Sequence, residues 1–113
     1  MNIKDLLPPT ENKIEFHLSK LNFLPELNSC YVISNFFGEI LYIGLTNNLK
    51  RRVKEHLESR EKTKLTQKGK GYFLYYKIIE REIELKIHER SWLNQFELME
   101  GKLPILNSIH SPL

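Results

Sequence analysis

The sequence lacks the features of a secreted, disulfide-bonded or membrane-spanning protein. It has one cysteine, Cys30, so no internal disulfide can form and no second cysteine supports a zinc site. No apolar run approaches the roughly 20 residues that span a bilayer, and the opening residues show no signal-peptide pattern. We therefore expect a cytoplasmic protein without membrane contact, in which Cys30 packs inside a strand.

Glycine and proline are also scarce, and no internal repeat or low-complexity segment is present. Hydrophobic residues make up 41% and charged residues 27% of the 113 residues, which is typical of one folded domain. We divide the chain into an N-terminal extension, residues 1–28, and a main domain, residues 29–113. The oligomeric state cannot be predicted from the sequence.

The net charge of +3 suits a nucleic-acid partner but is also common in proteins that bind none. The distribution of the basic residues is more informative, because they concentrate in the middle of the chain. We predict nucleic-acid contacts for Lys50, Arg51, Lys54, Lys62, Lys64, Lys68 and Lys70.

The first half of the chain carries signals for a helix, a hairpin and a second helix. Ile14, Leu18 and Leu21 recur at helical spacing, which predicts a short helix in the extension. Residues 30–33 and 40–43 are rich in β-branched and aromatic side chains and flank a turn-like segment, so they predict a β-hairpin. Residues 49–59 follow candidate N-caps and repeat apolar residues every fourth position, which predicts a helix.

The second half alternates between loop, strand and helix. Residues 60–71 are lysine-rich without an apolar period, so we expect an exposed loop. Residues 72–79 read as a central strand buried on both faces. A helix follows, with one face formed by Leu85, Glu89, Trp92, Phe96 and Met99, although its first residues also alternate like a strand. Gly101 is expected to end it.

Polar groups with possible chemistry lie on these elements. Tyr31 and Tyr42 come from the two hairpin strands, where tyrosines are most often core residues. A 100° step per residue places Arg52 and His56 beside the apolar stripe of their helix and turns Arg51 to the solvated side. An arginine and an imidazole held against a sheet can bind a phosphate, but residues at a helix margin often serve solubility alone.

Glu89 is a carboxylate on an apolar helical face. Burying such a group is costly unless it is paired or binds a metal. Two interpretations stay open: a structural ion pair, for example with Arg52, and a ligand for Mg²⁺, which prefers carboxylate oxygen.

The order and spacing of these residues closely resemble the core of GIY-YIG endonucleases. Ten residues separate Tyr31 from Tyr42, Arg52 follows ten positions after Tyr42, and His56 lies one helical turn further on, as in the family motif. Tyr42-Ile43-Gly44 matches the second half of the motif. The first half reads Ser29-Cys30-Tyr31, so the family's glycine is lost and its tyrosine is kept.

The similarity extends to the end of the chain, since Glu89 and Asn107 match the family's later glutamate and its terminal asparagine. It implies an α/β fold of the α+β type, with a small three-stranded antiparallel sheet flanked by helices. It also implies a metal-dependent endonuclease that hydrolyses phosphodiester bonds in DNA.

By the same resemblance, Glu89 would hold one Mg²⁺ or Mn²⁺ and Arg52 would contact a phosphate oxygen. Tyr31 or Tyr42 would position or deprotonate the attacking water. His56 would share the proton transfer or bind phosphate, and Asn107 would brace the site. The alternatives are a nucleic-acid-binding module that does not cut and a purely structural domain; the presence of every candidate catalytic residue favours the nuclease.

Overall fold

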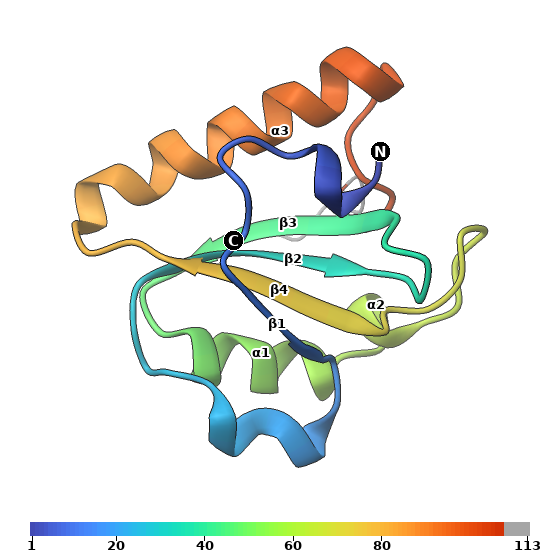
Figure 1. Ribbon diagram of the computed structural model, residues 1–113. Coiled ribbons are helices and arrows are strands. Elements are labelled where there is room, and N and C mark those ends of the chain that lie inside the picture. Colours follow the sequence, from blue (N-terminus) through green and yellow to red (C-terminus); the bar gives the residue numbers. More distant parts are fainter. Residues whose placement is uncertain (108–113) are drawn as a thin grey trace.

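A computed structural model describes residues 1–107 and shows one antiparallel sheet between helices. The strand order is β1-β4-β2-β3, with α3 over one face and α1 over the other (Figure 1). The α+β fold is confirmed, with four strands instead of three. The strands are β1 Asn12–Glu15, β2 Ser29–Ser34, β3 Ile40–Thr46 and β4 Phe73–Ile78. The helices are α1 Leu49–Leu57, α2 Arg60–Thr63 and α3 Leu85–Glu100, with 3-10 turns η1 Ile3–Asp5, η2 Leu18–Phe23 and η3 Glu82–Glu84.

The fourth strand, β1, lies where we predicted part of a helix, so that prediction is wrong for these residues. Asn12–Glu15 pairs with β4 at the sheet edge, and Ile14 packs against the core. Of the residues in the predicted helix, those in η2 are helical. Three apolar residues spaced at 14, 18 and 21 fit one helix equally well, and pairing with the free edge of β4 decides the outcome.

The most deeply buried strand is β2, which lies between β3 and β4 with all six residues buried. The prediction that residues 72–79 are buried on both faces is wrong for part of β4, because Tyr76 and Lys77 are half-buried and Ile78 is exposed. The short polar strand β1 covers this side of β4 incompletely. The β2–β3 hairpin itself is confirmed.

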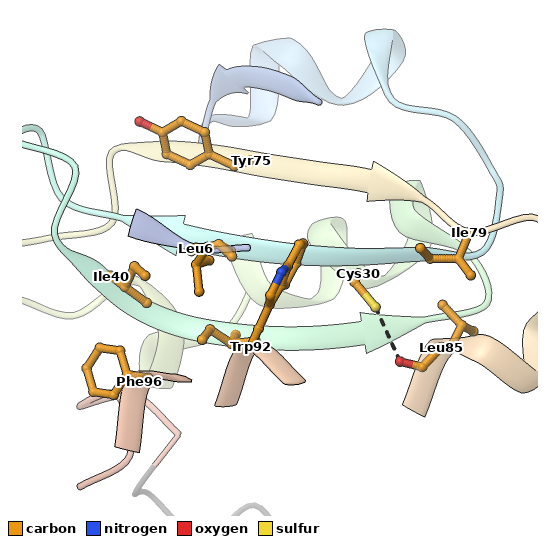
Figure 2. Packing of buried hydrophobic residues seen from close by; sticks show 10 residues of the cluster. Leu6, Cys30, Ile40, Tyr75, Ile79, Leu85, Trp92 and Phe96 are labelled. Atoms are coloured by element: carbon orange, nitrogen blue, oxygen red, sulfur yellow. Dashed lines mark hydrogen bonds between the residues drawn. The ribbon is translucent and has the colours of Figure 1, made fainter. Parts of the chain in front are cut away.

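The core between the sheet and α3 contains Leu6, Cys30, Trp92 and Phe96, whose side chains meet there (Figure 2). The Cys30 thiol donates a hydrogen bond to the Leu85 carbonyl, 3.4 Å away, so the predicted packing role is confirmed. The helix predicted after β4 is confirmed as α3. Its first residues are helical and do not form the strand that their alternation also allowed. Its predicted inner face is wrong at the end, because Met99 is 59% exposed.

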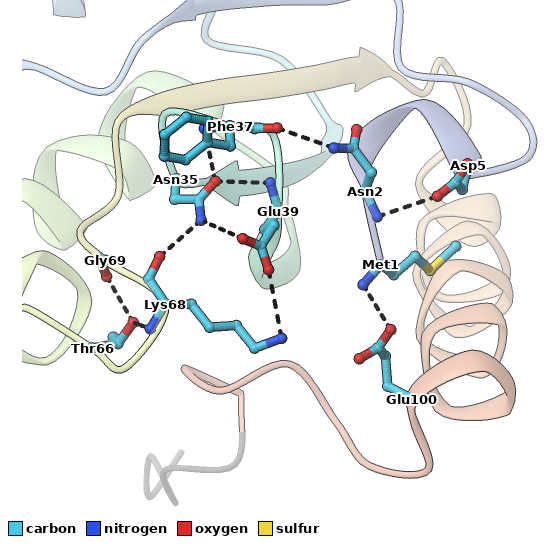
Figure 3. Close-up of polar contacts among 10 residues, drawn as sticks. All are labelled: Met1, Asn2, Asp5, Asn35, Phe37, Glu39, Thr66, Lys68, Gly69 and Glu100. Carbon is cyan, nitrogen blue, oxygen red and sulfur yellow. Dashed lines mark hydrogen bonds and ion pairs between the residues drawn. The ribbon is translucent and has the colours of Figure 1, made fainter.

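The helix α3 ends at Gly101, which adopts the left-handed conformation at φ 74° as predicted. The N-terminal ammonium of Met1 donates a hydrogen bond to the Glu100 carboxylate near this end (Figure 3). In the β2–β3 turn, the Asn35 side chain accepts hydrogen bonds from the amides of Phe37 and Glu39 and donates one to the Lys68 carbonyl (Figure 3). No helix within residues 1–107 is long and apolar enough to cross a membrane.

Candidate active site

The β2–β3 hairpin brings Tyr31 and Tyr42 to the face that carries α1. Tyr31 pairs with Gly44 across the strands and Tyr42 pairs with Ile33, so the two tyrosines are diagonal neighbours. Their ring centroids lie 5.9 Å apart. Gly44 makes this approach possible, because a Cβ there would lie 2.7 Å from the Tyr42 ring and 2.8 Å from the Tyr31 hydroxyl.

The helix α1 supplies His56 to the same place. Asn48 caps the helix by accepting a hydrogen bond from the Arg51 amide, and buried Leu49 and Val53 hold it against the sheet. His56, one turn after Arg52, is 3% exposed. Its Nε2 lies 2.6 Å from the Tyr31 hydroxyl, and its ring centroid is 5.3 Å from that of Tyr42.

Tyr31 and His56 are both held in their neutral forms. Burial raises the pKa of Tyr31 well above its usual range, Tyr42 raises it further, and Arg52 opposes this effect. Burial lowers the pKa of His56 to about 3, with smaller effects from Arg52 and Lys62. At neutral pH the short hydrogen bond therefore joins an uncharged phenol to an uncharged imidazole.

Acid is expected to destabilise the protein through His56. Its pKa falls from 6.5 to about 3 on folding, so the unfolded chain binds a proton that the folded protein does not. The free energy of unfolding should therefore fall as the pH drops from 6.5 towards 3, by about 2 kcal/mol between pH 7 and pH 5. Urea unfolding of wild type and His56→Gln measures this, since the variant should lose that part of the slope. An equal slope in both proteins would contradict the assignment.

Arg52 is half-buried and pairs with Glu55 on the next turn of α1 at 3.3 Å. The alternative in which Arg52 forms a structural ion pair with Glu89 is therefore wrong. Both partners of the Arg52–Glu55 pair are partly exposed, so the pair stabilises the fold little and Arg52 can exchange Glu55 for a phosphate.

A pocket of about 490 Å³ opens beside Arg52 at the end of β3. Arg51 lines it too, and its residue is exposed, as the prediction of a solvated side requires. The Arg51 guanidinium donates to the Asn47 side chain at 2.8 Å, which draws its long side chain back towards the turn before α1. The rest of the lining is Leu45, Thr46, Asn47, Glu55, Glu82 and Leu85.

Lys62, which we predicted to lie in an exposed loop, adds a further cation to the site. That prediction is wrong here, since α2 forms within the segment and Lys62 is 5% exposed. Its ammonium donates to the Leu106 carbonyl at 3.2 Å and lies 4.5 Å from the centre of the Tyr42 ring. This burial also removes Lys62 from the set available to bind nucleic acid on the surface.

The other predicted nucleic-acid contacts differ in accessibility. Lys54, Lys64 and Lys70 are exposed, whereas Lys50 is half-buried. Lys68 is half-buried and lies 3.7 Å from Glu39 (Figure 3).

Asn107 braces the edge strand β3. Its side-chain oxygen accepts from the Ile43 amide and its side-chain nitrogen donates to the Ile43 carbonyl, both at 2.8 Å. This pairing replaces a missing strand partner one residue from Tyr42. Both the oxygen and the nitrogen of the Asn107 side chain therefore bind the backbone, which fits a positioning role.

Glu89 is half-buried on α3 and forms no ion pair within residues 1–107. Burial raises its pKa, and the neighbouring Arg90 and Lys86 oppose this effect. Glu89 lies near Cys30, whose pKa rises to about 12 through burial and then through this carboxylate. Among residues 1–107, no hydrogen bond or ion pair joins it to Tyr31 or His56. The described residues contain no cluster of three or more metal-binding side chains, so Glu89 is a single carboxylate without a partner.

The model of the GIY-YIG catalytic domain matches residues 27–102. The chain belongs to this family. It is thus an endonuclease-type hydrolase domain, as the order of its tyrosines, arginine and glutamate predicted. The match begins at residue 27, and the predicted start of the main domain at residue 29 stays a prediction.

Curated relatives of this GIY-YIG chain include UvrABC system protein C from two bacteria. The protein from Lactiplantibacillus plantarum is 30% identical over 89 residues, which cover 78% of this chain and 14% of the relative. The protein from Levilactobacillus brevis is 30% identical over 94 residues, covering 82% and 14%. The chain therefore spans only about 14% of the length of these relatives.

A similar solved structure is the GIY-YIG N-terminal endonuclease domain of UvrC from Thermotoga maritima. One point mutant of it, bound to the catalytic divalent cation, superposes with a TM-score of 0.57 at 20% identity. The match covers 79% of this chain and 91% of that one. A second point mutant, also bound to its catalytic divalent cation, gives 0.57 at 21% identity. At this identity the likeness supports the fold.

Within this GIY-YIG domain, sequence reasoning anticipated Tyr31, Tyr42 and His56 as neighbours. It missed Lys62 and the part that Arg51 takes in the pocket. No local pattern distinguishes Lys62 from the exposed lysines around it. The Asn47-Asn48 pair before α1 was a usable signal for Arg51, because an asparagine four residues earlier can hydrogen-bond the guanidinium.

Proposed function

We propose that this chain is a divalent-metal-dependent endonuclease that hydrolyses phosphodiester bonds in DNA. The observation that carries the proposal is that Tyr31, Tyr42 and His56 contact one another close to Arg52, which with Arg51 lines a pocket. A phosphodiester in that pocket would meet two guanidinium groups, and Arg52 also interacts with the neighbouring phenols of Tyr31 and Tyr42. The relatives' printed name, UvrABC system protein C, supports DNA as the substrate.

Arg52 binds a non-bridging oxygen of the scissile phosphate and stabilises the charge that grows there in the transition state. It leaves Glu55 to do so, at little cost because that pair is exposed to solvent. Arg51, held by Asn47 at the same pocket, contacts a second phosphate oxygen or a neighbouring phosphate. These two contacts hold the DNA strand in the pocket.

Tyr42 is the better-placed phenol to meet that water, because it is half-buried whereas Tyr31 is fully enclosed. As the water oxygen bonds to phosphorus, its proton passes to the ionised form of Tyr42 or Tyr31, and the leaving oxygen departs with the bonding electrons. A free phenol, with a pKa of about 10, is a poor base at neutral pH. The surrounding cations therefore have to favour the phenolate. The Tyr31–His56 hydrogen bond offers a route for the proton away from the phosphate.

Glu89 is the residue that would hold the metal, as Mg²⁺ or Mn²⁺. A partly buried carboxylate that has no ionic partner among residues 1–107 fits a hard cation, which would take its remaining ligands from water and phosphate oxygens. When bound, such an ion supplies Lewis-acid stabilisation of the phosphate charge.

Lys54, Lys64 and Lys70, exposed on the surface, are proposed to contact the DNA backbone further from the cut, and Lys50 and Lys68 more weakly. Two copies of the chain, or two successive cuts, would be needed to break both strands of a duplex. The activity and partners of the much longer relatives belong to those proteins.

A substrate comparison tests the proposal against a nucleic-acid-binding module that does not cut. Duplex DNA, single-stranded DNA and RNA of one sequence are incubated with the protein and Mn²⁺, and products are separated by length. We expect cleavage of DNA. Binding to all three without products would favour the non-cleaving module, and faster cleavage of RNA would overturn the choice of substrate.

A further inference from the structure

The buried Lys62 is an unusual cation, because its side chain has no carboxylate partner among residues 1–107. Its ammonium contacts a carbonyl, that of Leu106, and the face of an aromatic ring, that of Tyr42. Burying a charged amine without an opposite charge is costly, and burial lowers the pKa of Lys62 accordingly. An apolar residue of the same length would fill this space without the desolvation cost of a buried ammonium.

The surroundings of Tyr42 explain where an opposite charge can arise. Tyr31 lies beside it on β2 and His56 beside it on α1, both uncharged in the resting protein. Lys62 covers one ring face from α2 at 4.5 Å. The other charged groups that act on this cluster are Arg52 on α1 and, around Lys62 itself, Glu61 and Lys64. Lys62 and Arg52, the two charged groups shown to act on Tyr42, are therefore both positive.

We propose that Lys62 is a further positioning residue of the active site, whose buried ammonium stabilises negative charge on the Tyr42 phenol. A cation over an aromatic ring is attracted to its electron-rich face, and the attraction becomes a full charge interaction when the phenol loses its proton. Lys62 thus supplies a positive charge over one face of the Tyr42 ring, independent of bound metal or DNA. The inference deepens the proposed function, in which a tyrosine accepts the proton of water.

The hydrogen bond to Leu106 fixes Lys62 in this position. Leu106 donates its amide to the Leu41 carbonyl at 2.9 Å, and the next residue, Asn107, pairs with Ile43. The C-terminal turn thereby holds both Lys62 and the strand that carries Tyr42. A purely structural role would consist of this anchoring alone, and it predicts no effect of the Lys62 charge on the ionisation of Tyr42.

Tyrosinate absorbance distinguishes the two roles without any cleavage assay. The full chain, free of metal and DNA, is titrated with base as wild type and as Tyr42→Phe, and the difference between the two curves gives the contribution of Tyr42 among the five tyrosines. The same pair is then measured with Lys62→Met and with Lys62→Gln. Methionine removes the charge and fills the space, whereas glutamine keeps a donor for the Leu106 carbonyl.

We expect both neutral variants to move the Tyr42 transition to higher pH by about one unit, and Lys64→Met, an exposed neighbour, to leave it in place. No shift in either Lys62 variant, or a shift that persists when Tyr42 is already phenylalanine, would overturn the proposal. A shift in Lys62→Met alone would also overturn it, since it would trace to the lost hydrogen bond. A protein that shows the shift but cuts no DNA would refute the proposed function and leave this inference intact.

Discussion

Replacing Arg52 by alanine is expected to lower the rate of DNA cleavage by about 100- to 1,000-fold, the usual effect of removing a group that stabilises transition-state charge. Arg52 lines the pocket, interacts with Tyr31 and Tyr42, and forms its ion pair with the partly exposed Glu55. Single-turnover rates with saturating protein measure the effect on the chemical step apart from binding.

Arg51→Ala is the matched control, because it removes the same chemical group from the adjacent position of α1. The Arg51 guanidinium is anchored to Asn47 and its residue is exposed, so we expect weaker DNA binding with a modest change in the single-turnover rate. The slope of log affinity against log salt should fall by up to about one unit. An equal loss of single-turnover rate in both variants would remove the distinction between the two arginines.

Saturating Mn²⁺ is expected to raise the melting temperature of the wild-type protein by about 10 °C, and Glu89→Gln should abolish that rise. An ion at 100 times its dissociation constant stabilises the folded state by about 2.7 kcal/mol, and each kcal/mol corresponds to roughly 4 °C or more in a domain of this size. Thermal melts of both proteins with and without Mn²⁺ supply the measurement.

Without metal, Glu89→Gln should be as stable as wild type or slightly more stable at neutral pH. Burial raises the pKa of Glu89 in the folded state, so its favourable contribution is present only below the unfolded pKa of about 4.5 and is lost as the pH rises. Glu97→Gln, an exposed position on the same helix, is the control and should keep the full response to Mn²⁺. An unchanged response in Glu89→Gln would place the ion elsewhere.

The elements that the sequence predicted well are those with strong local signals. The hairpin, α1 and α3 each combine a hydrophobic period with a recognisable start or end, such as the Asn48 cap and Gly101. The site tyrosines follow from them, since two residues on paired strands must lie close together. Helical phase likewise placed His56 against the sheet.

What the sequence could not provide depends on contacts between distant segments. The strand β1 exists because β4 offers a free edge 58 to 64 residues later, and the burial of Lys62 depends on the turn that contains Leu106, 44 residues away. The position of the Arg51 guanidinium depends on a hydrogen bond to the side chain of Asn47, which helical phase does not predict. Helical phase correctly assigned Glu89 to the inner face of its helix, but only the fold shows that it has no ionic partner among residues 1–107.

The most direct test of a metal-dependent nuclease is the conversion of supercoiled plasmid DNA to its nicked form. Wild-type protein is compared in Mg²⁺ and in EDTA, alongside Glu89→Ala in Mg²⁺. We predict nicking by the wild type in Mg²⁺, none in EDTA, and a loss of at least about 100-fold in the variant. Nicking that persists equally in EDTA and in Glu89→Ala would contradict the account.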